Sequence, residues 1–264
     1  MEILLPILGV LIGIIAAMTG IGGGVFIVPL LTLLHNFSPA QAVGTSLTTI
    51  IFTSLASTAN YSRQRRIYYK TGLILATTTV PGAFLGAYLT SIIEARVLGL
   101  IFGVFLIFVA LRMIFEFSFF RSQGLSARRG IHHLVDSESS LFESRTKIWL
   151  GVILSFFGGL SSGLLGIGGG VLLVPIMTLA MGILIHTAVA TSMFTMIFTS
   201  TSGVIQHLSL GNISVEYALP LVAGTIFGAQ VGAHVSKKVS GQTLRKVFGI
   251  VLILVSVQMI LKYI

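Results

Sequence analysis

Two glycine-rich stretches decide how this sequence can fold: GIGGGV at residues 20–25 and GIGGGV again at residues 166–171. Each stretch interrupts an apolar part of the chain, and each is followed by a short apolar run that contains a proline, Pro29 or Pro175. Glycine adopts backbone conformations that end a helix, and it is a poor residue for a helix interior. Both stretches therefore predict a helix that breaks and then restarts.

The composition around these breaks is that of a membrane protein. Of the 264 residues, 55% are apolar and only 9% are charged, and the mean hydropathy is +1.02. Soluble domains carry about 25% charged residues, so the chain is predicted to be an all-α polytopic membrane protein. Ten apolar runs are bounded by charged residues, glycine or proline: 3–19, 25–37, 40–60, 71–92, 96–116, 148–164, 171–184, 187–207, 216–236 and 243–262.

The two halves of the chain are copies of each other. A shift of 146 positions, from Gly20 to Gly166, aligns them without a gap. Roughly a third of the aligned positions are identical, which is far more than shared hydrophobicity produces. The sequence therefore predicts a first transmembrane repeat at 1–116, a basic connector at 117–147 with a short interfacial helix near 125–135, and a second transmembrane repeat at 148–264.

The distribution of Lys and Arg predicts how the copies lie in the membrane. Basic residues cluster at 63–70, 112–147 and 237–246, and basic loops stay in the cytoplasm. The loop 208–215, which corresponds to the first cluster, has no Lys or Arg. We therefore expect two inverted-topology repeats of about five transmembrane segments each, with both termini outside and the short glycine-led broken helices near the midplane. The alternative is a parallel pair of repeats in which the two short runs are re-entrant.

The glycine breaks are the first candidate binding elements. Broken helices free backbone N–H groups, and these cannot remain unpaired in lipid. The helix that restarts after each break adds about half a positive charge at its N-terminus. An anion site without any charged side chain is therefore expected, with close helix packing through small residues as the alternative. The candidate residues are Gly22, Gly23, Gly24, Gly168, Gly169 and Gly170.

Hydroxyl side chains near the start of runs 40–60 and 187–207 form the second candidate set. Each run has a Thr-Ser pair and a further Thr four residues after the first, so both Thr residues share one helix face. Hydroxyl groups can donate hydrogen bonds to an oxyanion. Hydrogen bonding between helices is the alternative role for such residues in membranes. The residues are Thr45, Ser46, Thr49, Thr191, Ser192 and Thr195.

Few ionisable residues lie within the apolar runs. His207 and Glu216 are the candidates for proton coupling, although their places near helix ends also fit interfacial side chains. The chain has no Cys, and His132-His133 lacks Asp, Glu or Cys at ligand spacing, so neither a metal site nor a cofactor is predicted. An enzyme is not expected, because the apolar runs contain neither a Ser/His/Asp set nor paired carboxylates.

The duplicated motifs resemble those of the TauE/SafE sulfite exporter family, also called the TSUP anion permeases. The resemblance lies in Gly-x-Gly-Gly-Gly-(x)3-Val-Pro and Thr-Ser, each present twice, and it covers nearly the whole chain except the connector. It implies an inner-membrane carrier of sulfite, sulfoacetate or other organosulfonates, driven by ion or proton gradients. It nominates the glycines and Thr-Ser pairs given above as the binding residues. Ala190 stands where the first copy has Gly44, which predicts two half-sites that are not equivalent.

The predicted function is a secondary transporter that exports small sulfur-containing anions by alternating access. An anion channel, or a carrier for another small organic or inorganic anion, is the alternative. The expected partners are a small anionic substrate and the lipid bilayer, and the sequence is compatible with a homodimer. The net charge of +9 is attributed to membrane orientation rather than to nucleic-acid binding. The expected location is the cytoplasmic membrane of a prokaryote, with the connector 117–147 in the cytoplasm.

Overall fold

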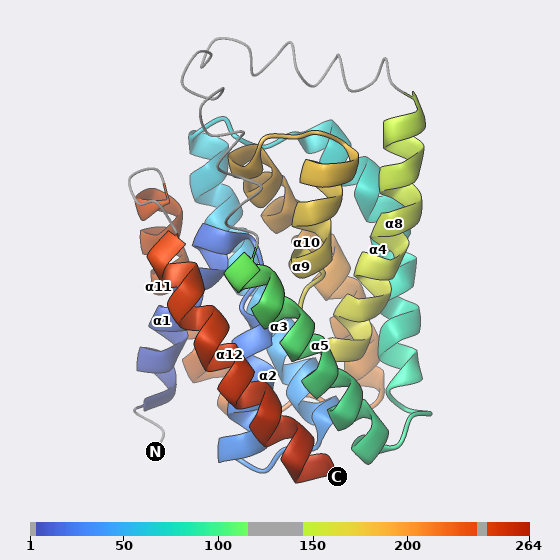
Figure 1. The fold of residues 1–264 in the computed structure, drawn as a ribbon, viewed down its shortest axis with the longest axis vertical. Coiled ribbons are helices and arrows are strands. Elements are labelled where there is room, and N and C mark those ends of the chain that lie inside the picture. Colours follow the sequence, from blue (N-terminus) through green and yellow to red (C-terminus); the bar gives the residue numbers. More distant parts are fainter. Residues whose placement is uncertain (1–3, 116–144, 237–241) are drawn as a thin grey trace.

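The protein is all-helical throughout the part of the chain that its computed structural model describes, residues 4–115, 145–236 and 242–264 (Figure 1). The helix expected near 125–135 and most of the predicted connector lie outside the described residues. Each of the ten apolar runs forms a helix, which confirms the prediction of an all-α protein. The boundaries differ from the predicted runs by a few residues.

The first repeat contains five helices. Their bounds are α1 Leu4–Thr19, α2 Gly24–Leu34, α3 Pro39–Arg63, α4 Tyr69–Leu89 and α5 Ala95–Phe115. The start of α3 shows how local sequence sets a boundary. Ser38 caps the helix by accepting a hydrogen bond from the Gln41 backbone N–H, and Pro39 occupies the first turn, where its missing N–H costs nothing.

The second repeat follows the same order. Its elements are α8 Arg145–Leu165, α9 Gly170–Pro175, the π-helical segment η3 Ile176–Ala180, α10 Ile185–Ser209, α11 Val215–Val235 and α12 Gln242–Tyr263. The short run after the second break thus differs from its equivalent, because α2 is α-helical throughout whereas α9 continues into η3. A proline inside each segment, Pro29 or Pro175, removes one helical N–H donor.

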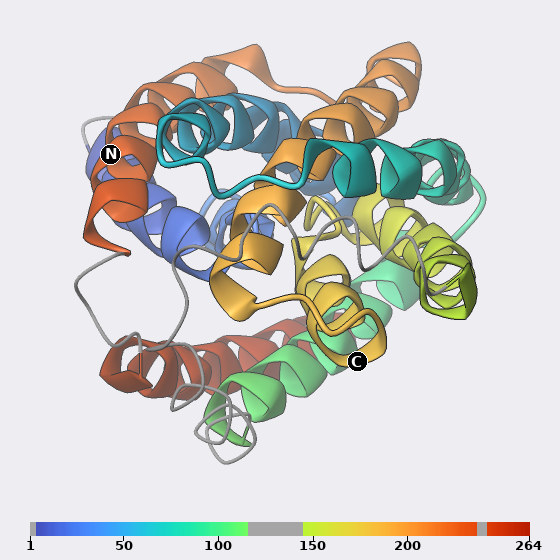
Figure 2. The ribbon, with the colours of Figure 1, turned by 90° about the horizontal axis from the view of Figure 1, so that it is seen from above.

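The helices pack as two bundles that do not coincide with the two repeats. The first helix of each repeat packs along the fourth helix of the other, so α1 lies against α11 and α8 lies against α4 (Figure 2). We define the first bundle as α1, α2, α3 and α11, and the second bundle as α8, α9, η3, α10 and α4. Helices α3 and α10 pack against each other where the bundles meet.

Helices α5 and α12 form a separate pair beside the two bundles (Figures 1 and 2). The two helices run side by side in opposite directions in Figure 1, α12 descending to the C-terminus and α5 ascending. Lys262 on α12 attaches the pair to the first bundle by donating hydrogen bonds to the Thr32 carbonyl and to Asn36 Oδ1. A cation at this position also stabilises the C-terminal end of α2.

Several helices are long and apolar enough to cross a membrane. Among the described residues these are α3, α4, residues Ile148–Leu165 of α8, α10 and α11. Shorter apolar helical segments are Leu4–Thr19, Gly24–Leu34, Ala95–Leu111, Gly170–Ala180 and Leu252–Tyr263. Large apolar side chains such as Phe227 and Leu254 are exposed on the outer surface, as expected for a surface that faces lipid.

We call α4 and α11 the exchanged helices, because each packs in the bundle of the other repeat. Glycine residues bring them into close contact with α8 and α1. A Cβ atom at Gly228 of α11 would collide with the Val10 carbonyl oxygen of α1, and one at Gly86 of α4 would collide with the Leu160 carbonyl oxygen of α8. These glycines belong to the Gly-Ala-x-x-Gly-Ala motif of each repeat. The motif therefore has the structural role that small-xxx-small spacing predicts.

We predict that Gly228→Ala destabilises the protein by about 1–3 kcal/mol, because the methyl group overpacks a backbone contact. Gly158→Ala in α8 is the matched control, since a Cβ atom there would lie 3.7 Å from its nearest neighbour, Leu172 Cβ. Thermal unfolding of the purified protein in detergent measures both. A control midpoint that falls as far as that of Gly228→Ala would contradict close contact between α1 and α11.

Candidate functional site

The two glycine breaks cross each other at the centre of the protein. A Cβ atom at Gly24 would collide with the Gly166 carbonyl oxygen, and a Cβ atom at Gly170 would collide with the Gly20 carbonyl oxygen. The contacts are reciprocal, because each residue and its counterpart are related by the shift of 146 positions. The structure thus brings together the two sets of glycines that the sequence placed far apart.

Each break ends in a glycine with a left-handed backbone. Gly23 has φ 87° and precedes α2, and Gly169 has φ 82° and precedes α9; neither helix start has a side-chain cap. None of the backbone hydrogen bonds recorded between described residues is donated by the amides of Gly22–Gly24 or Gly168–Gly170. A buried amide needs an acceptor, so the glycine amides of both breaks are candidate donors to a ligand or to water.

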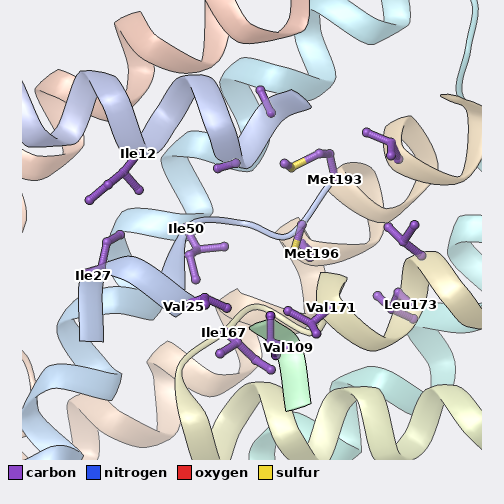
Figure 3. Close-up of a cluster of buried hydrophobic side chains, with 14 of the residues drawn as sticks. Ile12, Val25, Ile27, Ile50, Val109, Ile167, Val171, Leu173, Met193 and Met196 are labelled. Atoms are coloured by element: carbon purple, nitrogen blue, oxygen red, sulfur yellow. The ribbon is translucent and has the colours of Figure 1, made fainter. Parts of the chain in front are cut away.

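Apolar side chains fill the space between the two breaks. Ile50 of α3 and Met196 of α10 occupy equivalent positions, and a Cβ atom at Gly168 would lie 2.9 Å from Ile50 Cγ2 and 2.9 Å from Met196 Sδ. A Cβ atom at Gly22 would lie 2.9 Å from the same Met196 Sδ. Figure 3 shows these two side chains with Val25, Ile167 and Val171 around the crossing. The inner side of the crossing is therefore closed by hydrocarbon.

The two predicted serines link each central helix to the opposite break. Ser46 Oγ donates to the Gly166 carbonyl oxygen at 2.8 Å. Ser192 Oγ lies 3.1 Å from the Gly20 carbonyl oxygen and 2.9 Å from the Val189 carbonyl oxygen of its own helix, so its single proton is shared between these two acceptors. Both side chains are fully buried. Because α3 belongs to the first bundle and Gly166 precedes α9 in the second, these hydrogen bonds join the two bundles.

The two threonines of the Thr-Ser pairs hold the start of the exchanged helices. Thr45 Oγ1 accepts a hydrogen bond from the Ser214 backbone N–H at 3.1 Å, and Thr191 Oγ1 accepts one from the Tyr68 backbone N–H at 3.0 Å. Ser214 and Tyr68 are the N-cap residues of α11 and α4. Each Thr therefore fixes a helix within its own bundle, by satisfying an N–H group that the helix leaves unpaired.

The remaining predicted hydroxyls bond to backbone carbonyls. Thr49 Oγ1 donates to the Thr45 carbonyl at 3.1 Å. Thr195 Oγ1 is 3.0 Å from the Thr191 carbonyl and 3.3 Å from the carbonyl of Gly72 on α4. In this conformation the hydroxyl stripe serves contacts within and between helices, as the alternative interpretation described. A role of these residues in substrate contact stays a prediction.

His207 and Glu216 lie in contrasting environments. His207 is fully buried, with Nε2 3.1 Å from the Gly163 carbonyl oxygen and Nδ1 3.4 Å from Asn212 Nδ2. A carbonyl can only accept a hydrogen bond, so these contacts fit the neutral ring with its proton on Nε2. Glu216 is exposed in the first turn of α11. Of the two candidates for proton coupling, the structure encloses only His207.

The counterpart of His207 in the first repeat is Tyr61, which is 146 positions earlier. Tyr61 Oη donates to the Ala17 carbonyl oxygen at 2.6 Å, and Ala17 is the counterpart of Gly163. The same hydrogen bond is thus made by a phenol in one repeat and by an imidazole in the other. Neither repeat alone indicates this pair. Aligning the polar residues of the two repeats at the shift of 146 positions identifies it.

The crossed breaks, the membrane-length helices and the pairing of helices between repeats are those of a polytopic membrane protein. The Sulfite exporter TauE/SafE family model matches residues 5–259. The chain belongs to this family, as the duplicated motifs predicted. As a member of a transporter family with apolar helices, it is a multi-pass cell-membrane protein of a prokaryote and not an enzyme.

Several similar proteins are named as probable membrane transporter proteins. The probable membrane transporter protein YunE of Bacillus subtilis is 34% identical over 98% of this chain and 97% of its own length. A probable membrane transporter protein of Methanocaldococcus jannaschii is 28% identical over 92% of this chain and 89% of its own. The probable membrane transporter protein YdhB of Bacillus subtilis is 30% identical over 84% and 85%. No solved structure matches the chain.

We predict that Ser46→Ala lowers stability by about 0.5–1.5 kcal/mol, because it removes a buried hydrogen bond between the bundles. Ser54→Ala is the matched control, since Ser54 is equally buried on α3 but donates to the Ile51 carbonyl of its own helix. Thermal unfolding in detergent compares the two. Equal losses would show that Ser46 does not link the bundles.

Proposed function

We propose that the protein is a secondary transporter of small sulfur-containing anions, such as sulfite, sulfoacetate or another organosulfonate, and that it exports them by alternating access. Membership of the TauE/SafE family and the relatives named as membrane transporters support transport. The observation that carries the choice of an anion is the pair of crossed breaks whose glycine amides lack recorded backbone acceptors.

The chemistry of the crossing suits an anion with several oxygen acceptors. Backbone N–H groups at two helix starts supply donors and a positive dipole end. The described side chains beside the breaks are apolar or carry hydroxyl groups, such as Ile50, Met196 and Ser46. In a low-dielectric interior, oriented dipoles attract an anion without the desolvation cost of a buried Lys or Arg. A neutral donor set also releases its cargo more readily.

The bundles suggest how the site is exposed to each side in turn. Hydrogen bonds within each bundle connect its helices, such as those that Thr45 accepts from Ser214 and Thr191 accepts from Tyr68. The crossing, joined by Ser46 and Ser192, lies between the bundles. We infer that rocking of one bundle against the other opens the crossing alternately. The reciprocal contacts and the opposite directions of α5 and α12 support an inverted arrangement of the repeats, as alternating access requires.

We predict that Gly23→Ala and Gly169→Ala each reduce anion flux by about tenfold or more, a change that corresponds to about 1.4 kcal/mol. Both glycines have positive φ, so a side chain strains the backbone that presents the amides. Flux of sulfite and sulfoacetate into proteoliposomes, with counterflow, provides the measurement. Counterflow distinguishes a carrier from an open channel, because only a carrier exchanges external for internal anion.

Gly182→Ala and Gly211→Ala are the matched controls for backbone strain. Both residues have positive φ, at 76° and 68°, but a Cβ atom there would meet nothing within 4 Å. We expect both variants to keep wild-type flux. An equal loss of flux in all four variants would assign the effect to strain alone. Wild-type protein that moves none of the tested anions faster than empty liposomes would refute the proposed function.

We further propose that His207 couples transport to protons. Protonation of Nδ1 would replace an accepted hydrogen bond with a second N–H facing Asn212, and Asn212 lies in the linker between α10 and α11. The recorded hydrogen bonds of the side chain involve Gly163 and Asn212, neither of which titrates. A proton on His207 would therefore act directly on that linker.

His207→Tyr tests this role, because it copies Tyr61 and preserves a donor to the Gly163 carbonyl. We expect downhill flux to persist, whereas accumulation driven by a pH gradient is lost. Glu216→Gln, on the exposed surface of α11, should retain both. Accumulation in His207→Tyr that still follows the pH gradient would exclude His207 as the coupling residue.

A further inference from the structure

The outer sides of the two breaks differ, although the repeats align without a gap. At the first break, a Cβ atom at Gly23 would lie 2.9 Å from Ile12 Cγ2 and 3.4 Å from Ala16 Cβ, both on α1. Figure 3 shows Ile12 beside the first break, close to Ile27. This break is therefore backed by hydrocarbon.

At the second break the same wall is smaller and polar. The positions equivalent to Ile12 and Ala16 are Gly158 and Ser162 of α8. A Cβ atom at Gly169 would lie 3.0 Å from the Gly158 carbonyl oxygen and 3.6 Å from Ser162 Cβ. A Cβ atom at Gly158 itself would find its nearest neighbour at 3.7 Å. Leu172 and Leu173 would lie within ordinary contact distance of that atom. The large side chain and the methyl group of the first break are thus replaced by a glycine and a side chain that carries a hydroxyl group.

The hydroxyl group of Ser162 has no hydrogen-bond partner among the described residues, and the residue is fully buried. A serine in a helix usually satisfies its hydroxyl on a carbonyl of the preceding turn, as the neighbouring Ser161 does by donating to the Gly158 carbonyl at 3.0 Å. An orphaned buried donor is unfavourable unless something else supplies the acceptor. In a transporter, a bound anion can supply it.

The glycine backbone of the second break lies close to the Ser162 side chain. A Cβ atom at Gly169 would lie 3.0 Å from the Gly158 carbonyl oxygen and 3.6 Å from Ser162 Cβ, and the helical segment Gly170–Ala180 starts immediately after Gly169. The amides of Gly168, Gly169 and Gly170 donate none of the recorded backbone hydrogen bonds between described residues. The second break thus has a side chain with a hydroxyl group beside its glycine backbone, whereas Ala16 supplies no hydroxyl at the first.

We propose, on the basis of the transport function proposed above, that the substrate's oxyanion group binds at the second break between Gly169 and Ser162. The Ser162 hydroxyl donates to one oxygen of a sulfite or sulfonate group, and the glycine amides donate to the others. The first break then contributes its backbone donors without a hydroxyl group from α1. Ser162 is a substrate-binding residue, and the two half-sites are unequal.

Binding of sodium sulfite and of sulfoacetate to the purified full-length protein tests the proposal by titration calorimetry and by the ligand-dependent shift of the unfolding midpoint. Ser162→Ala, which copies Ala16, should weaken binding about tenfold or more, since a hydrogen bond to a charged group is lost. Its midpoint without ligand should stay level or rise, because an orphaned hydroxyl is removed; a purely structural serine would give a lower midpoint. Ser162→Thr keeps the hydroxyl and should retain binding.

Ser200→Ala is the matched control, since Ser200 is another fully buried serine without a partner among the described residues, but on α10. We expect it to bind like the wild type. If Ser162→Ala binds the anions as tightly as the wild type, or if Ser200→Ala loses as much affinity as Ser162→Ala, Ser162 is not a binding residue. Either result would leave the proposed transport function intact. Wild-type protein that neither binds nor transports these anions would overturn the proposed function itself.

Discussion

The close approach of two backbones at the centre is the constraint on which the rest of the structure depends. Gly24 and Gly170 each lie so near a carbonyl of the opposite break that no side chain fits. This contact requires both chains to be non-helical at the same level, which leaves amide groups without intrahelical partners. It also supplies carbonyl oxygens to the serines of the central helices, Ser46 and Ser192. Glycine is therefore required here for space as well as for the positive φ of the adjacent cap residues.

Because α4 and α11 pack in the bundle of the other repeat, the Thr and the Ser of the Thr-Ser motif have different structural roles. The chain leaves the first bundle after α3 and enters the second bundle at α4, and it returns from α10 to α11. At each entry point, a Thr of the receiving bundle accepts the N–H of the helix cap, as Thr191 does for Tyr68. The adjacent Ser reaches across to the opposite break. One dipeptide thus anchors a helix inside its bundle and connects the bundles, so any relative motion of the bundles acts on the serine contacts first.

Much of this architecture follows from the sequence, but the exchange does not. The gapless shift of 146 positions predicts the repeats, and the apolar runs predict each helix of the described residues. The glycine stretches predict the breaks. A shift identifies which residues are equivalent, however, without telling whether a contact lies within one copy or between copies. The α1–α11 pairing and the reciprocal hydrogen bonds of Ser46 and Ser192 therefore had no sequence signal. The hydroxyls themselves were found, but residue type alone does not distinguish a donor to substrate from a donor to backbone.

Departures from the two-fold pattern carry information because the pattern is otherwise so closely kept. Tyr61 and His207 make the equivalent hydrogen bond to a carbonyl with a phenol and an imidazole. Ala16 and Ser162 lie beside equivalent breaks, and only Ser162 carries a hydroxyl group. The imidazole of His207 and the hydroxyl of Ser162 both belong to the second repeat, and His207 bonds to Gly163, the residue after Ser162 on α8. A proton on the imidazole and an anion at the second break would thus act on adjacent residues of one helix. Opposite charges arriving at neighbouring positions in a low-dielectric interior stabilise each other, which gives a physical route for coupling the two that a symmetric pair of breaks would lack.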